Sequence, residues 1–362
     1  TGWLQGAPAW QFAYNKISQL PLDAARHSLR NCFRELNRLG ITSVGDVHTR
    51  TVTFAHRRVL AELARSGELS LRVNFYIAVN ESDGDVGRLQ SLVEEVKSLN
   101  PHDMFRFAGF AETVTEDAAS AARSGAGDAA AKEKFRRSAG FFAQGGYNFQ
   151  LAVGSDAAAR RGLDVLEEVH SATPFARHRI IFAELDDPTP ETIERIKKLG
   201  GAIAVESRMA LTGERNVEMW GPEKTRNAPP LRTMIESGIR LGAGSGAFQA
   251  ANYSPMLSLW WLVTDKTVAG STLRSRTQNL TRAEALRLYT MGSAWLTFEE
   301  GRKGSIEVGK YVHLAVLNAD YLRVPEEQIR SPQSLLTIVG GRVVYAAGPF
   351  DPSAPKGGKR VR

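Results

Sequence analysis

Short β-rich runs alternate with amphipathic helical stretches along most of the chain, and this alternation limits the fold more than any other feature. A helical stretch follows each run after a short connection, which is the pattern of a parallel sheet with helices packed outside it. Seven strand candidates precede Gly244, so we expect either an open sheet or a closed barrel. These candidates are 41–44, 71–79, 105–110, 149–153, 180–183, 202–205 and 239–243.

The pattern changes after residue 280. Thr281 and Glu284 have the spacing of a capping box, so we expect a helix to begin there and to extend to about Trp295. The segments 335–339 and 342–345 flank two glycines, which predicts a β-hairpin with a two-glycine turn. A small β-unit therefore follows the α/β part of the chain.

Charge and composition exclude several classes of protein. The 362 residues include 46 Lys and Arg against 39 Asp and Glu, a net charge of +7. Four basic residues lie in the last seven positions, within an expected flexible tail at 351–362, so the rest carries 42 against 39, or +3. This balance argues against a nucleic-acid-binding fold, which normally has a basic patch. The glycines of 242–246 do not match the GxGxxG fingerprint of dinucleotide-binding proteins.

Other simple features also limit the interpretation. Cys32 is the single cysteine, so neither an internal disulfide nor a CxxC metal site can form. No apolar run approaches the roughly 18 residues of a membrane-spanning helix. No signal peptide is visible, so we expect no membrane span and a cytoplasmic or unassigned location.

A family pattern is spread over six segments of the chain. They are 36–46 (LNRLGITSVGD), 156–169 (DAAARRGLDVLEEV), 178–184 (HRIIFAE), 238–247 (GIRLGAGSGA), 281–318 and 337–348 (TIVGGRVVYAAG). In these segments the chain resembles the amidohydrolase superfamily, specifically its YtcJ-like (amidohydrolase 3) branch. The resemblance implies a (β/α)8 TIM-type barrel over 1–300 and a small flanking β-sandwich over 301–350. It also implies hydrolysis of C–N bonds with one or two divalent metals such as Zn.

The resemblance implies, further, that the chain starts inside the family pattern. Its opening Thr1-Gly2-Trp3-Leu4 resembles a segment that normally lies well inside the protein, and the family's first-strand His-x-His pair is not in the sequence. We therefore expect a barrel that is incomplete at the N-terminus. Another protein chain, or a second copy of this one, would then complete the barrel and the sandwich.

Three ligand positions of the family, and the place of its bridging lysine, carry residues without metal-binding side chains. The histidine of the pattern His-Ala-Ile-Gly-Asp falls on Ala152, and the last histidine of His-Arg-Ile-Glu-His falls on Phe182. The aspartate of Gly-Ser-Asp falls on Gly246, and the place of the bridging lysine falls on Ala111, with Glu112 next to it. Zinc and related ions require His, Asp, Glu, Cys or a carboxylated Lys. We therefore expect no family-type metal centre and no cofactor.

Polar residues near the carboxyl ends of the predicted strands are the candidate binding residues of the barrel mouth, because active sites of such barrels lie there. They are Asp46, His48, Glu112, Asp156, Glu206, Arg208 and Ser245. Structural roles are alternatives for several of them. Asp156 could cap a helix, Glu206 and Arg208 could pair with each other, and Ser245 has no assigned histidine beside it.

Three functions are compatible with these residues. The first is an amidohydrolase-fold protein without the metal centre, acting as a ligand-binding, structural or regulatory subunit. The alternative is a working hydrolase of amide-type C–N bonds, with ligands supplied by an N-terminal segment outside this chain. A metal-independent lyase or isomerase rests on the versatility of barrels alone.

Overall fold

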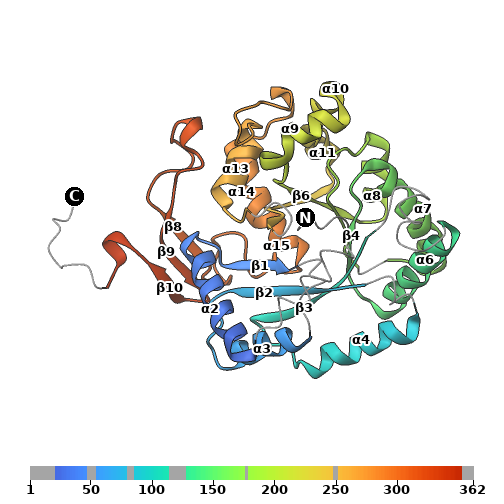
Figure 1. Cartoon of the computed structure of the whole chain (residues 1–362), viewed down its shortest axis with the longest axis horizontal. Helices are drawn as coiled ribbons and strands as arrows, with labels where there is room; N and C mark the ends of the chain where they lie inside the picture. The colour runs from blue at the N-terminus through green and yellow to red at the C-terminus, as the bar shows by residue number, and fades with distance from the viewer. Residues whose placement is uncertain are drawn as a thin grey trace, which may run out of the picture.

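The fold is built on a seven-stranded parallel sheet in which each strand pairs with the next strand along the chain. The structure is a computed structural model that describes residues 21–46, 54–79, 85–113, 128–175, 178–247 and 252–352. The sheet curls around the middle of the molecule (Figure 1). Its strands are β1 (Ser43–Asp46), β2 (Arg72–Ala78), β3 (Phe105–Thr113), β4 (Phe149–Ala152), β5 (Ile180–Ala183), β6 (Ala202–Glu206) and β7 (Arg240–Gly244).

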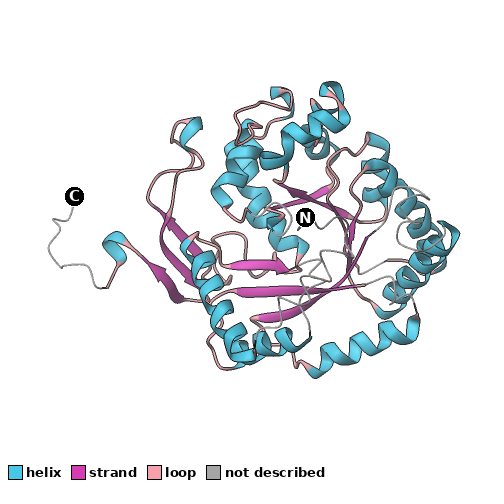
Figure 2. Cartoon of the chain, viewed as in Figure 1, coloured by secondary structure: helices cyan, strands magenta, loops and turns pink. Residues whose placement is uncertain are grey.

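Helices cover the outer side of the curled sheet, as Figure 2 shows. They are α2 (Leu22–Arg38), α3 (Phe54–Arg65), α4 (Val86–Ser98), α6 (Asp128–Gly145), α7 (Asp156–Ala172), α8 (Pro190–Lys198), α9 (Met209–Trp220), α10 (Pro222–Thr225), α11 (Leu231–Ser237), α13 (Pro255–Thr264), α14 (Arg282–Arg287) and α15 (Ser293–Leu296). The predicted parallel α/β architecture is confirmed. The first strand lies two residues later than the predicted 41–44. Helix α13 was not predicted, because Trp260 and Trp261 are both buried and the helix has no polar side to reveal its period.

Alternate residues of each strand face opposite sides of the sheet. Phe182 pairs with Leu151 and Ile203, and all three belong to the large core that the sheet shares with the helices. This row therefore faces outward. The inner row, one position further along, consists of Ala152, Ala183 and Ala204.

The end of α15 reaches the inner side of the sheet. Leu296 packs against a small separate core that includes Tyr76, whose hydroxyl donates to the carbonyl oxygen of Leu296 at 3.3 Å. The π-helical turn η3 (Leu288–Gly292), just before α15, contacts β7 so closely that a Cβ at Gly292 would lie 2.3 Å from the carbonyl oxygen of Leu241. Only glycine allows this approach.

The expected eight-stranded closure is not found within the described residues. There, β1 pairs with β2 alone and β7 with β6 alone, so the sheet has two edges. The observed architecture is therefore a curled parallel sheet of the α/β class. None of the helices that the structure describes has the length and apolar content needed to cross a bilayer.

A buried charged cluster lies at the amino ends of β2 and β3. The Glu299 carboxylate, which is fully buried, is 2.8 Å from Arg72, 2.8 Å from Arg106 and 2.6 Å from Lys303. Asn74 donates to it at 2.8 Å. Burial opposes the charge, but these partners outweigh it and lower the pKa of Glu299 to about 2. The cluster joins the segment after α15 to the first strands of the sheet.

A second, antiparallel sheet has the strand order β10-β9-β8. It consists of β8 (Leu314–Leu317), β9 (Ser334–Val339) and β10 (Arg342–Ala346). The predicted hairpin is confirmed, with its turn at Gly340 and Gly341. One side of this sheet packs on α2, where the Thr337 hydroxyl donates to the carbonyl oxygen of Asn37 at 2.7 Å. A small antiparallel sheet thus flanks the parallel one.

Candidate functional site

Four charged side chains meet at the carboxyl ends of β5 and β6, and we call them the mouth cluster: Glu184, Asp186, Glu206 and Arg208. The guanidinium of Arg208 lies 2.8 Å from Asp186, 3.3 Å from Glu184 and 3.3 Å from Glu206. All four side chains are less than one-fifth exposed. Carboxyl ends of parallel strands are where barrel enzymes place their functional residues, so this cluster is the candidate site.

The local backbone of β5 helps to build the cluster. Glu184 directly follows β5 and has a φ of 60°, a left-handed conformation that is uncommon outside glycine. Such conformations persist where the surrounding structure holds them, and they concentrate at functional sites. The carboxylate of Glu184 is thereby held against Arg208, the residue that directly precedes α9 on the neighbouring βα unit.

Burial changes the acidity of the mouth cluster. Burial raises the pKa of Glu206 to about 7, with a further increase from the neighbouring carboxylates Glu184 and Asp186, although Arg208 opposes it. Burial likewise raises the pKa of Asp186 to about 6. For Arg208, burial disfavours the charge, but the three carboxylates outweigh it and raise its pKa. The cluster can therefore exchange protons near neutral pH.

Gly246 lies against this cluster. A Cβ atom at position 246 would be 2.8 Å from Oε2 of Glu206 and 2.9 Å from Cγ of Arg208, and the backbone has a φ of +61°. Any side chain at this position would be strained and would displace the ion pair. The room that a metal-binding aspartate would need is therefore filled by Arg208 and Glu206.

The other two substituted ligand positions lie on opposite sides of the sheet. Ala152 is buried on the inner row, paired with Ala183. Phe182 is fully buried on the outer row, where it belongs to the large core. Side chains alternate along a strand, so a residue next to the inward-facing Ala183 must face the helices.

These residues do not fit a divalent metal ion of the family type. Alanine and phenylalanine offer no donor atom, and glycine offers only its backbone. Within the six described ranges, no group of three or more His, Cys, Asp or Glu residues is arranged to hold a metal ion. The carboxylates of the mouth cluster surround a guanidinium, which already supplies the positive charge.

Asp46 ends β1 and Asp156 begins α7, so neither belongs to the mouth cluster. Asp46 pairs in register with Phe75, which belongs to the row of β2 that packs in the outer core. Burial lowers the pKa of Arg57 in α3, and the negative charge of Asp46 opposes this effect. Ser245 is half-buried in the turn after β7. His48 lies outside the described residues, as does the side chain of Glu112, whose backbone belongs to β3.

Asp156 has a structural contact with the next helix. Ser155 is the N-cap of α7, which corrects the interpretation of Asp156 as the cap. Asp156 instead accepts from the backbone N–H and hydroxyl of Thr189, at 2.8 and 3.1 Å. Thr189 is itself the N-cap of α8, so the carboxylate joins the starts of two helices.

A surface hollow of about 670 Å³ adjoins these helix starts. Lys224 enters it and pairs with Asp187 at 2.5 Å, and Asp187 also accepts from the backbone N–H of Asp156 at 2.8 Å. Its lining residues include Ser155, Asp156, Asp187, Thr189, Lys224 and Asn227. The carboxylates and the ammonium group of this hollow already have partners within the chain.

Of the seven predicted site residues, Glu206 and Arg208 lie together in the mouth cluster. They pair with each other, which is one of the two alternatives that the sequence left open for them. Sequence reasoning missed Glu184 and Asp186. Both follow the predicted strand 180–183 closely, so the rule that placed Glu206 could have selected them too.

Comparison with known proteins gives a consistent result. The sequence profile described as "Amidohydrolase family" matches residues 1–345. An N-substituted formamide deformylase of Arthrobacter pascens is 30% identical over 154 residues, which are 42% of this chain and 28% of that protein. The YtcJ protein of Bacillus subtilis (strain 168), described as a putative amidohydrolase, is 26% identical over 54% of this chain and 36% of its own length. The chain thus matches about a third of each of these relatives.

A solved structure with a similar fold is an uncharacterized metal-dependent hydrolase from Pyrococcus horikoshii OT3. It superposes with a TM-score of 0.68 at 20% identity, over 88% of this chain and 64% of that chain. At this identity the likeness concerns the fold alone, and it supports the α/β architecture described above.

Proposed function

The chain belongs to the amidohydrolase family, and from this premise we propose that its barrel mouth acts without the family's metal centre. In this proposal the protein is a ligand-binding, structural or regulatory subunit. The observation that carries it is the position of Arg208. Its guanidinium takes the place of a cation among three carboxylates, and its side chain and that of Glu206 fill the room beside Gly246.

The substitutions support this proposal from a second direction. Phe182 has no donor atom, and its side chain lies on the outer side of the sheet, away from the mouth. The mouth cluster retains acid–base groups whose pKa values lie near neutrality. Such groups suit the recognition of a polar ligand by hydrogen bonds, and they do not need a metal for it.

We also propose a division of the chain that follows the family. Residues 1–300 would form the barrel part and 301–350 the β-sandwich part, with 351–362 as a basic tail. The two sheet edges at β1 and β7 would then be completed by another chain or by a second copy, because unpaired strand edges favour pairing.

The second candidate is a working hydrolase of amide-type C–N bonds. The similarity to an N-substituted formamide deformylase favours it. Its metal ligands would come from outside the described residues, for example from an N-terminal segment outside this chain, since the described residues hold no metal-binding group.

Metal analysis separates the two candidates. We expect the chain, purified without chelator and then dialysed against Zn²⁺-free buffer, to retain well under one equivalent of Zn, Fe, Ni or Mn by elemental analysis. A stoichiometric metal that survives dialysis would overturn the metal-free proposal. Hydrolysis of an N-substituted formamide that a chelator abolishes and Zn²⁺ restores would establish the second candidate.

A further inference from the structure

A second buried ion pair lies next to the mouth cluster. The loop that follows α13 runs from Asp265 to Arg274, and we call it the α13 loop. The side chains at its two ends are fully buried, and Nε of Arg274 is 3.3 Å from the Asp265 carboxylate. The guanidinium also packs over the ring of Trp261 at 4.7 Å. The negative charge of Asp186 acts on Arg274 as well as on Arg208, so Asp186 connects the two ion pairs into one buried network.

The α13 loop packs directly on α9. The backbone N–H of Val268 donates to the carbonyl oxygen of Ala210 at 2.8 Å. A Cβ at Gly213 of α9 would be 2.7 Å from Cγ2 of Thr267, so the loop and the helix are in close contact. Figure 1 shows α9 beside α13, from which the loop continues. Because Arg208 directly precedes α9, the mouth cluster holds the start of this helix and the α13 loop holds its side.

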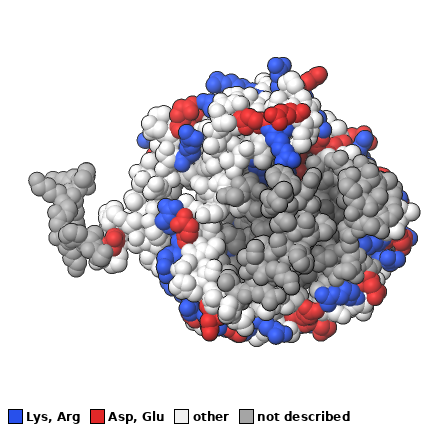
Figure 3. All heavy atoms as spheres, in the orientation of Figure 1, with Lys and Arg blue, Asp and Glu red and all other residues white. Residues whose placement is uncertain are grey.

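The network holds more carboxyl groups than cations. It contains four carboxyl groups and two guanidinium groups, all less than one-fifth exposed: Glu184, Asp186, Glu206, Asp265, Arg208 and Arg274. Full ionisation would therefore leave two negative charges in excess and out of contact with bulk water, which is unfavourable. Figure 3 shows a different arrangement at the described surface, where Lys and Arg lie among Asp and Glu in contact with water.

Protons can remove this excess near neutral pH. Burial raises the pKa of Asp265 to about 7, although Arg274 opposes the increase. The pKa of Glu206 is also about 7, and that of Asp186 is about 6. Burial lowers the pKa of Arg274 only to about 10, so the cations keep their charge. The charges that act on the three titrating carboxyl groups are those of Glu184, Asp186, Asp187, Arg208 and Arg274.

A further carboxylate of α9 faces the α13 loop without titrating in this range. Glu214 accepts a hydrogen bond from the hydroxyl of Thr267. Burial opposes its charge, but this hydrogen bond helps to lower the pKa of Glu214 below its ordinary value. The charge of Glu214 is therefore constant near neutral pH.

We propose that α9 and the α13 loop form a pH-sensitive switch, which is closed on the mouth while the buried network holds protons and opens as the network loses them. Protonated carboxyl groups bring the network close to neutrality, so the helix and the loop pack without a buried excess of charge. Ionisation restores the excess, and opening gives the carboxylates access to water. Glu206 and Asp265 have raised pKa values, so their contribution to the closed form is lost as the pH rises through about 7.

Hydrogen exchange of the full chain measures this opening directly. Mass spectrometry at pH 5.5 and pH 8.5, corrected for the intrinsic pH dependence of amide exchange, compares the protection of α9 in the two states. We expect the protection to be about tenfold or more lower at pH 8.5, because one pKa unit corresponds to a tenfold change in an equilibrium constant. Helix α4 contributes no residue to the network, so it serves as the internal reference and should change less.

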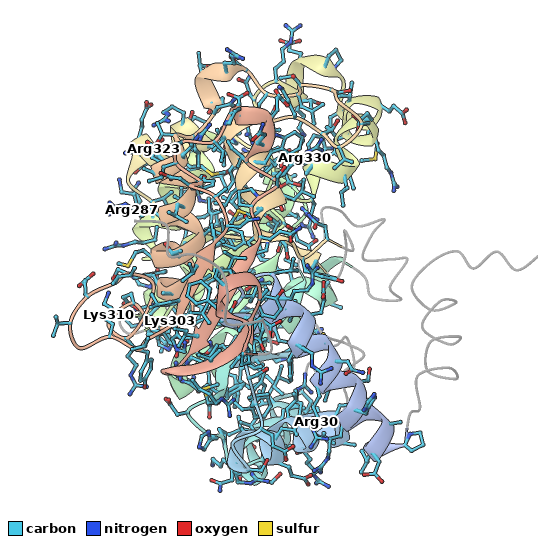
Figure 4. The ribbon with its side chains drawn as sticks, turned by 90° about the vertical axis from the view of Figure 1, so that its left-hand side faces the viewer. Arg30, Arg287, Lys303, Lys310, Arg323 and Arg330 are labelled. Atoms are coloured by element: carbon cyan, nitrogen blue, oxygen red, sulfur yellow. The ribbon has the colours of Figure 1, made fainter. Side chains whose placement is uncertain are left out.

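Two substitutions remove the titrating groups while keeping their shape. Glu206→Gln and Asp265→Asn should each make α9 better protected than the wild type at pH 8.5, and the double variant should lose most of the pH dependence. A merely damaged structure would change in the opposite direction. Asp320→Asn is the matched control, because Asp320 pairs with Arg323 at the surface, where the two side chains are 54% and 88% exposed. Figure 4 shows Arg323 on the outside of the molecule; this control should keep the wild-type pH dependence.

The remaining outcomes count against the switch. Equal protection of α9 at both pH values overturns the proposal, as does a pH dependence that the double variant retains in full. A loss of the same size in α4 also overturns it, because the whole fold would then be losing stability. If Asp265→Asn lacks the circular dichroism spectrum of the folded chain, Glu206→Gln alone decides, through the protection of α9 at pH 8.5 relative to the wild type.

Discussion

Arg208→Met should destabilise the protein strongly, and by an amount that depends on pH. Methionine keeps most of the length and packing of the arginine but removes the guanidinium that Glu184, Asp186 and Glu206 share. Removing one partner from a buried ion pair typically costs about 3–5 kcal/mol, because the remaining charge is left buried. We expect a loss of this size at pH 8, which is above the pKa values of both Asp186 and Glu206.

The sign of the pH dependence follows from the raised pKa values. Glu206 titrates near 7 in the folded protein against its ordinary 4.5, so between these values the folded state holds more protons than the unfolded state. Its contribution to stability is therefore present below about pH 4.5 and is lost as the pH rises through 7. Once the guanidinium has been replaced, the unpaired carboxyl groups take up protons more readily. The destabilisation should thus fall by about half or more at pH 5.5, since one pKa unit corresponds to about 1.4 kcal/mol.

Urea denaturation at pH 8 and pH 5.5 measures this difference directly. Arg30→Met is the matched control, because Arg30 pairs with Glu68 at the surface and both side chains are about two-fifths exposed. Exposed pairs contribute about 0–1 kcal/mol, so the control should change little at either pH. A loss below about 1 kcal/mol for Arg208→Met, or an equal loss at both pH values, would refute the proposed role of the guanidinium.

Three further substitutions test the same interpretation of the structure. Gly246→Asp should lower the free energy of unfolding by about 1–3 kcal/mol in denaturant titration, because the backbone has a positive φ and the space beside it is filled. Gly244→Ala should cost less, because no atom lies within 4 Å of its Cβ. Equal effects of the two substitutions would contradict the argument. Phe182→His should lower the melting temperature, with a loss of about 1–3 kcal/mol, because it buries an imidazole among apolar side chains; a variant as stable as the parent, or stabilised by Zn²⁺, would show that position 182 faces the mouth. Glu299→Gln should cost about 3–5 kcal/mol at pH 7. In acid the penalty should fade as the pH drops from 4.5 toward 2, because the unfolded wild-type chain then binds a proton at Glu299 that the folded state binds only near pH 2. A penalty that persists at pH 2 would argue against the charged cluster.

Local patterns in the sequence were sufficient to predict the secondary structure of most of the chain. Thr189 caps α8, Thr281 and Glu284 form the predicted capping box, and the hairpin turns at Gly340 and Gly341. These features depend on hydrogen bonds and backbone preferences within a few residues, so they are readable from the chain itself. The alternation of strands and helices likewise predicts a parallel sheet, since parallel neighbours need a long crossover.

The site depended on information that only the tertiary structure holds. Phe182 and Ala183 are adjacent in the sequence, but they face opposite sides of the sheet, and a shift of one residue in register would exchange them. The family pattern assigns a metal ligand to a position in the sequence, but it does not say which side of the sheet that side chain faces.

The mouth cluster illustrates the physical reason. Its members come from two consecutive βα units, and in the sequence they are only charged residues after two strands. The pKa values of Asp186 and Glu206 rise because both groups are buried, and burial is a property of the packed molecule. The sequence by itself determined most of the strands and helices and their order, although not α13. The tertiary structure decided that Arg208 lies among three carboxylates beside Gly246, because long-range packing brings these distant residues together.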